Sequence, residues 1–153
     1  MRGRGVHATI LGDLHISEYI DDYPTCERTY ATLGIYPIEI TPDEVTSLLG
    51  VVPTRTQSAE ARPDGVCDVP AGWFLCSDGV IESRDVRRHI DWILDQIADK
   101  LDAFALLRND GGQSDISCYW LAASHSGGPS LRPNQMTIIG ELGLEIWFDF
   151  FAA

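Results

Sequence analysis

A long apolar stripe between residues 86 and 104 constrains the fold of this chain more than any other feature of its sequence. Six large apolar side chains recur there at intervals of 4, 3, 4, 4 and 3 residues, which keeps them on one side of an α-helix. They are Val86, Ile90, Ile93, Ile97, Leu101 and Phe104. The spacing predicts one continuous helix from about Arg84 to Leu107, capped by Ser83. Such a stripe must be covered, so this helix becomes the centre of the predicted core.

Segments on both sides of this helix predict the strands that would cover it. Alternating apolar and polar side chains indicate strands at residues 27–40, 115–122 and 144–151. The run at residues 72–76 indicates a short buried strand. Residues 54–70 are polar and rich in turn formers, which predicts a long loop that is either functional or mobile.

A capped helix follows the first predicted strand, and a similar segment recurs late in the chain. Thr41, Pro42 and Glu44 combine an N-cap residue, a first-turn proline and a capping box, and Gly50 ends the helix. The same order of strand, proline-initiated helix and glycine stop recurs around residues 131–142. The repeat predicts two strand–helix units, each of which buries one apolar stripe.

Length and composition place these elements in one domain. The chain has 153 residues, of which 44% are hydrophobic and 22% are charged, as in ordinary globular domains. We therefore expect an α+β fold, with an antiparallel or mixed sheet and helices packed on one face. A duplicated ferredoxin-like arrangement is the specific form that the repeat favours. Residues 1–25 are expected to form an N-terminal arm or an edge strand at 6–11, and residues 26–153 the domain.

The chain is strongly acidic, with 11 lysines and arginines against 23 aspartates and glutamates and a net charge of −12. A surface of this charge repels phosphate backbones and anionic lipid head groups, which argues against nucleic-acid and membrane partners. It attracts a basic protein or a metal cation. No apolar run approaches the ~20 residues of a membrane helix, and no signal peptide is visible, so a cytoplasmic location is expected.

Four aspartates follow one another along the predicted long helix, opposite its apolar stripe. Asp91, Asp95, Asp99 and Asp102 are spaced by 4, 4 and 3 residues. We interpret them as an acidic docking stripe for a basic partner, with the loop at 54–70 as a second contact surface. The alternative is an ordinary solvated helix face.

The four tryptophans fall into two groups. Trp73, Trp120 and Trp147 lie in predicted strands among apolar neighbours, which favours core packing over an aromatic cage or stacking platform. Trp92 lies away from the apolar stripe of the long helix and is assigned to the partner-binding surface.

A histidine and two cysteines offer a different chemistry. His89 lies beside the apolar stripe and could act as a base for Cys76 or Cys118 as nucleophile. The same position equally fits a buried, hydrogen-bonded histidine between helix and sheet, so no catalytic residue is assigned. With Cys26 and Cys67 the cysteines show no CxxC pair, which predicts free thiols, no metal site and no cofactor.

An ordered set of segments resembles a known family. They are 30–33, 40–45, 48–54, 72–75, 89–94, 118–120 and 142–146, and their order and spacing carry the resemblance rather than any single motif. Between about residues 27 and 150 the chain resembles a bacterial family known as domain of unknown function 4279. The resemblance implies a compact α+β domain and implies no activity and no catalytic residue.

Acidity, small size and the lack of a catalytic motif together predict a non-catalytic protein-binding module. Its concrete form would be an immunity-type or inhibitor protein that neutralises a basic partner such as a nuclease toxin. Two alternatives stay open. One is a small Cys/His-dependent hydrolase or transferase. The other is a scaffold that self-associates, for example as a homodimer, through the apolar strand at residues 144–151.

Overall fold

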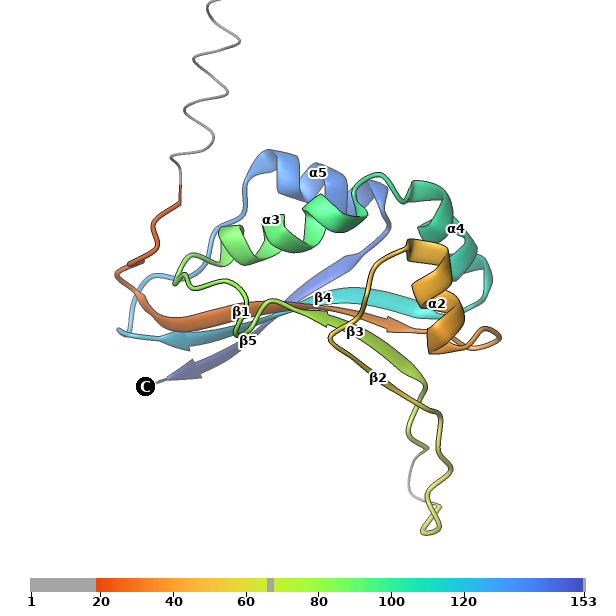
Figure 1. The fold of residues 1–153 in the computed structure, drawn as a ribbon. Helices are drawn as coiled ribbons and strands as arrows, with labels where there is room; N and C mark the ends of the chain where they lie inside the picture. The colour runs from red at the N-terminus through yellow and green to blue at the C-terminus, as the bar shows by residue number, and fades with distance from the viewer. Residues whose placement is uncertain (1–18, 66–67, 153) are drawn as a thin grey trace, which may run out of the picture.

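Alternating strands and amphipathic helices form two layers, in which all described helices lie on one side of a five-stranded sheet (Figure 1). The computed structural model describes residues 19–65 and 68–152. The expected edge strand at 6–11 and Cys67 lie outside the described residues. The elements in chain order are β1 (Cys26–Tyr36), α2 (Pro42–Leu49), β2 (Arg55–Gln57), β3 (Gly72–Cys76), α3 (Val86–Ile97), α4 (Leu101–Asn109), β4 (Gln113–Ala122), α5 (Pro133–Glu141) and β5 (Glu145–Ala152).

The sheet is mixed, which confirms the expected α+β class. Its strand order is β2-β3-β1-β4-β5, with β1 antiparallel to both β3 and β4, and β5 parallel to β4. Because β2 and β1 are both antiparallel to β3, they run in the same direction. The elements from β1 to β4 therefore have the β–α–β–β–α–β order of a ferredoxin-like unit, to which α5 and β5 are added.

The repeated sequence pattern corresponds to two β–α–β units rather than to two ferredoxin-like copies. One unit is β1–α2–β2, where β3 lies between the two parallel strands. The other is β4–α5–β5, where the two parallel strands are neighbours. The duplication expected from the sequence thus covers a strand, a helix and a return strand only.

Local signals set the ends of α2 as predicted. The Thr41 hydroxyl accepts a hydrogen bond from the backbone N–H of Glu44 at 3.2 Å, and the Glu44 carboxylate accepts one from the backbone N–H of Thr41 at 2.6 Å. Gly50 ends the helix in the left-handed conformation, with φ of 67°. The Trp73 indole N–H then donates to the Thr46 hydroxyl at 3.0 Å, which fixes α2 against β3.

The prediction of one helix from Arg84 to Leu107 is wrong, because residues 98–100 interrupt the helix and separate two shorter ones. Helix α3 ends at Ile97, and α4 begins at Leu101 in a new direction (Figure 1). Leu101, predicted to be in the core, is 46% exposed. Asp85, not Ser83, is the N-cap of α3, and its carboxylate accepts from the backbone N–H of Arg87.

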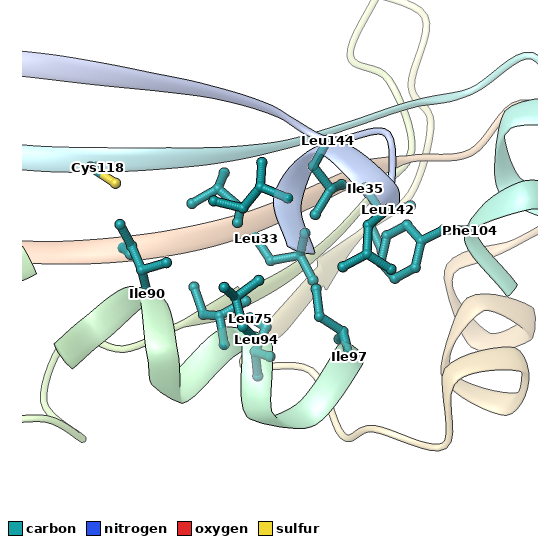
Figure 2. Close-up of a cluster of buried hydrophobic side chains, with 14 of the residues drawn as sticks. Leu33, Ile35, Leu75, Ile90, Leu94, Ile97, Phe104, Cys118, Leu142 and Leu144 are labelled. Atoms are coloured by element: carbon teal, nitrogen blue, oxygen red, sulfur yellow. The ribbon is translucent and has the colours of Figure 1, made fainter. Parts of the chain in front are cut away.

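The core fills the space between the sheet and the helices. Figure 2 shows Leu33 and Ile35 of β1 and Leu75 of β3 in one cluster with side chains of α3, of which Ile90, Leu94 and Ile97 are labelled. From α3 the buried members are Val86, Ile90, Ile93, Leu94 and Ile97. The predicted stripe is therefore confirmed for α3, and Phe104 continues it on α4.

Part of the predicted loop at 54–70 belongs to the sheet. Its first residues form β2, which pairs with β3, and Glu60 and Val69 form an isolated antiparallel bridge. The hairpin between β2 and β3 projects from the sheet away from the helices (Figure 1). No helix among residues 19–65 and 68–152 is long and apolar enough to cross a membrane.

Candidate functional site on the open face of the sheet

One face of the sheet carries no helix in the described part of the chain, and we call it the open face (Figure 1). Side chains alternate between the two faces along each strand. On β1 the core side chains are Ala31, Leu33 and Ile35, so the residues between them point to the open face. The register of the strands then assigns the open-face residues Tyr30, Thr32, Gly34, Tyr36, Arg55, Phe74, Cys76, Asp115, Ser117, Tyr119, Trp147 and Asp149.

A groove of about 240 Å³ lies in the middle of the open face. Small residues form its floor, because Thr32 pairs with Ser117 and Gly34 pairs with Asp115 across β1 and β4. Gly34 carries no side chain, which leaves room for the ring of Tyr36. A Cβ added at Gly34 would lie 3.3 Å from Cε2 of Tyr36, whose ring therefore leans over this glycine.

Aromatic rings form one wall of the groove. Tyr30 and Tyr119 are cross-strand partners whose rings stack with centroids 4.9 Å apart and planes 4° apart. Phe151 of β5 stacks on the other side of Tyr119, with centroids 5.0 Å apart. Arg28 lies at the end of this wall, with its guanidinium carbon 5.5 Å from the Tyr30 ring centroid. This ladder crosses three strands and holds the rings rigidly.

The opposite wall combines two aromatic rings with an arginine. The rings of Tyr36 and Phe74 meet edge to face, with centroids 5.6 Å apart and planes at 78°. The guanidinium carbon of Arg55 lies 3.9 Å from the centroid of the Phe74 ring. This is a cation–π contact, so the rings of this face accept a guanidinium group.

Carboxylates and one indole close the groove on the β5 side. Asp115 is half-buried and pairs in register with Glu145, while Asp149 lies opposite Tyr119. The Trp147 indole donates a hydrogen bond to the Asp115 carboxylate. Burial raises the pKa of Asp115, and the negative charge of Glu145 raises it further. The surroundings of Asp115 in the groove therefore disfavour the charged form of its carboxylate.

Comparison with known families identifies the domain that carries this groove. A family model described as a domain of unknown function, DUF4279, matches residues 27–152. The chain belongs to the DUF4279 family. The match confirms the resemblance seen in the sequence and includes every open-face residue named above. No curated protein and no solved structure matches the chain.

The DUF4279 domain does not present the four aspartates of the predicted stripe on one helix face. Asp91 and Asp95 lie one turn apart on α3, Asp99 lies in the break, and Asp102 lies in the first turn of α4. Because α3 and α4 are separate helices, the four aspartates do not share the single helix face that their spacing predicted. Asp95, Asp99 and Asp102 are exposed. Although Asp95 is exposed, partial desolvation by its neighbours and the negative charge of Asp91 raise its pKa.

Asp91 is used inside the DUF4279 domain rather than displayed on its surface. Its carboxylate accepts a hydrogen bond from the side-chain amide of Gln135 at 2.7 Å and one from the Tyr19 hydroxyl. The Arg132 guanidinium lies 3.7 Å away. Asp91 therefore ties α3 to α5 and to the segment that precedes β1.

The tryptophans of the DUF4279 domain depart from the predicted grouping at one position. Trp73 and Trp120 are buried in the core, as expected. Trp147 is 45% exposed and lies at the groove, so the core assignment is wrong for this residue. Trp92, assigned to the partner surface, is half-buried and packs against the core. Adjacent residues of a strand point to opposite faces of the sheet. In a strand that is apolar throughout, such as β5, the sequence therefore does not show which residues face the core.

The sheet separates the histidine of the DUF4279 domain from the cysteine on the open face. His89 Nδ1 lies 2.7 Å from the Ser77 hydroxyl oxygen, and Nε2 lies 2.8 Å from the Ser83 carbonyl oxygen. Cys76 points to the open face, where the Thr32 hydroxyl lies 3.3 Å from its sulfur. Cys118 is buried in the core near Ile90 (Figure 2), and burial raises the pKa of its thiol to about 12. Neither thiol is arranged as a nucleophile activated by His89.

The DUF4279 domain offers no metal-ligand cluster within residues 19–65 and 68–152. What sequence reasoning missed is the open face as a site. The signal was present, because strand alternation places Tyr30, Thr32 and Tyr36 on the face opposite the core side chains of β1. The sequence does not show that all described helices cover the other face, and without this fact the aromatic positions are read as core.

Proposed function

We propose that the chain is a non-catalytic protein-binding module whose open face accepts a basic partner. The groove on the open face supports this proposal, because it combines aromatic walls with the carboxylates of Asp115 and Asp149. Aromatic side chains dominate the energetics of protein interfaces, and carboxylates next to them select cationic groups. The net charge of −12 draws a basic protein toward the surface and speeds its association.

The arrangement favours binding over the Cys/His-dependent hydrolase or transferase that the sequence left open. A catalytic thiol must lie within hydrogen-bond reach of its base. Here the sheet lies between Cys76 and His89, whose ring nitrogens are both engaged by Ser77 and Ser83. An immunity-type or inhibitor protein is the form of binding module that best fits an acidic domain with a broad, uncovered face.

Charge reversal on the two faces of the domain tests this proposal. Asp115→Lys with Asp149→Lys places two lysines at the groove, and Asp95→Lys with Asp99→Lys makes the same charge change on the helix side. We expect the groove variant to bind a fluorescent basic peptide of mixed arginine and lysine about tenfold more weakly than the unaltered protein, measured by anisotropy at low salt. The helix-side variant should lose much less affinity.

Two results would contradict the proposal. Equal losses of peptide affinity in both variants would show that only the net charge of the protein matters. A larger loss in the helix-side variant would place the binding surface at the aspartates on the helix side. Circular dichroism of both variants establishes that each is folded before binding is compared.

Self-association through β5 is a second candidate, supported by the exposure of this edge strand. Phe150 is 61% exposed and Phe151 is 45% exposed, and within residues 19–65 and 68–152 β5 pairs only with β4. An exposed apolar edge strand is a template for pairing with another chain. A second copy paired with β5 would extend the sheet and leave the open face accessible.

Light scattering over a dilution series measures this association. We expect a dimer mass at high protein concentration and a monomer mass in Phe150→Lys, because a lysine on the edge disfavours pairing. Ser130→Lys, a substitution at an exposed position outside the strands, is the matched control and should dimerise like the unaltered protein. A monomer mass for the unaltered protein at every concentration would reject this candidate.

A further inference from the structure

We infer that the groove on the open face holds the guanidinium group of an arginine side chain that belongs to the basic partner. This inference rests on the proposed function and names the chemical group that the groove selects. The guanidinium would lie over the floor at Ser117, between the rings of Tyr36 and Trp147, with Asp115 as its carboxylate partner.

The domain already places two of its own guanidinium groups on the same face. Arg55 lies over the Phe74 ring at 3.9 Å, and Arg28 lies near both Tyr30 and Tyr119, at 5.5 and 5.8 Å from their ring centroids. Arg28 also pairs with Asp78 at 2.8 Å. These contacts mark the two walls of the groove as surfaces on which a planar cation stacks.

Among the described residues no cation pairs with the carboxylate at the centre of the groove, although Arg55 lines the same groove over the Phe74 ring. Within the described residues Asp115 forms no ion pair, and its hydrogen-bond donor is the neutral indole of Trp147, while Glu145 repels its charge. Asp78, at the end of the first wall, is in contrast paired with Arg28. A half-buried carboxylate that lacks a counter-ion is stabilised by an incoming cation, so the local charges favour occupation.

Geometry favours arginine over lysine. A guanidinium is planar and weakly hydrated, and it can stack on a ring while it donates in its plane to a carboxylate. The groove provides both partners, since rings stand at its sides and Asp115 lies between them. A lysine ammonium is compact and strongly hydrated, and it gains less from a stacked ring.

Peptides of matched length that carry arginine, lysine or citrulline test the inference. Citrulline keeps the planar shape of arginine and lacks its charge. By fluorescence anisotropy we expect the arginine peptide to bind about tenfold more tightly than the lysine peptide, and the citrulline peptide to show no measurable binding. Asp115→Asn should reduce the affinity for the arginine peptide to that of the lysine peptide.

Asp95→Asn is the matched control, because burial also raises the pKa of Asp95 and its removal changes the net charge equally. It should leave the preference for arginine intact, and Asp115→Asn should unfold at a temperature no lower than the unaltered protein. Equal affinity for arginine and lysine, or the same loss in both variants, would overturn the guanidinium assignment and leave the proposed function standing. Absence of binding to either cationic peptide would overturn the proposed function itself.

Discussion

Replacing Asp85 by alanine is expected to lower the free energy of unfolding by about 3–5 kcal/mol, more than any other single aspartate substitution. The carboxylate is 1% exposed and accepts from the backbone N–H of Arg87 at 3.1 Å and of Ile20 at 2.9 Å. The Arg87 guanidinium donates to both of its oxygens, at 2.9 and 2.6 Å. Burial acts to raise the pKa of Asp85, but these hydrogen bonds outweigh it and leave the pKa lowered. Alanine would remove the N-cap of α3 and the carboxylate that accepts two hydrogen bonds from the largely buried Arg87 guanidinium.

Urea denaturation followed by circular dichroism measures this loss. Asp85→Asn keeps an oxygen that can cap the helix and loses the charge, so its loss should be intermediate. Asp99→Ala, at an exposed position in the break between α3 and α4, should change stability by less than about 0.5 kcal/mol. A loss below about 1 kcal/mol for Asp85→Ala would show that the buried pair is not what holds the start of α3.

His89 is expected to make the fold acid-sensitive at mildly acidic pH. Burial lowers its pKa in the folded state, so the unfolded chain takes up the proton first as the pH falls below about 6.5. The free energy of unfolding should then fall by up to ~1.4 kcal/mol per pH unit until the lowered folded pKa is reached. Since the Ser83 carbonyl can only accept, Nε2 carries the proton, and in neutral His89 the other ring nitrogen, Nδ1, accepts from the Ser77 hydroxyl.

Stability curves at about pH 7 and about pH 5 measure this slope in the unaltered protein and in His89→Gln. The variant should lose the slope and about 2 kcal/mol of stability at neutral pH, because at least one buried hydrogen bond is broken. Hydrogen bonds from Ser83 and from the Ile38 backbone lower the pKa values of Asp21 and Asp110, so these carboxylates add acid sensitivity only below about pH 4.

His125→Gln, at an exposed position, should keep the slope of the unaltered protein. If the free energy of unfolding of His89→Gln still falls between about pH 7 and about pH 5 as in the unaltered protein, the acid sensitivity comes from another titratable group.

The sequence predicts an element well when residues within that segment set its ends. Thr41, Pro42, Glu44 and Gly50 act within one short segment, and α2 begins and ends where they indicate. The strands at the centre of the sheet were likewise visible, since β1 has one face in the core. The ferredoxin-like arrangement was expected from the repeat, but β2 lies in a segment that was predicted to be a loop, so this strand and the order of the neighbours came from the structure.

The break between α3 and α4 was not visible, because residues 98–100 contain neither glycine nor proline and the apolar spacing continues through Leu101. Helix α4 turns so that Ala103, Phe104 and Leu107 reach the core, which leaves Leu101 outside. This turn is a property of the packed molecule rather than of the segment. The groove was missed for a similar reason, since an aromatic residue such as Trp147 fits a core and an open face equally well in sequence.

The late position of β5 in the chain has a consequence during synthesis. Trp147 and Asp149 complete the groove, yet β5 lies beside β4 at the edge of the described sheet and leaves the ribosome after the other described strands. Domains fold largely as units while translation proceeds from the N-terminus. A nascent chain that has released β1 to β4 still lacks Trp147 and Asp149, so the groove that we propose as the binding site is complete only once β5 has emerged.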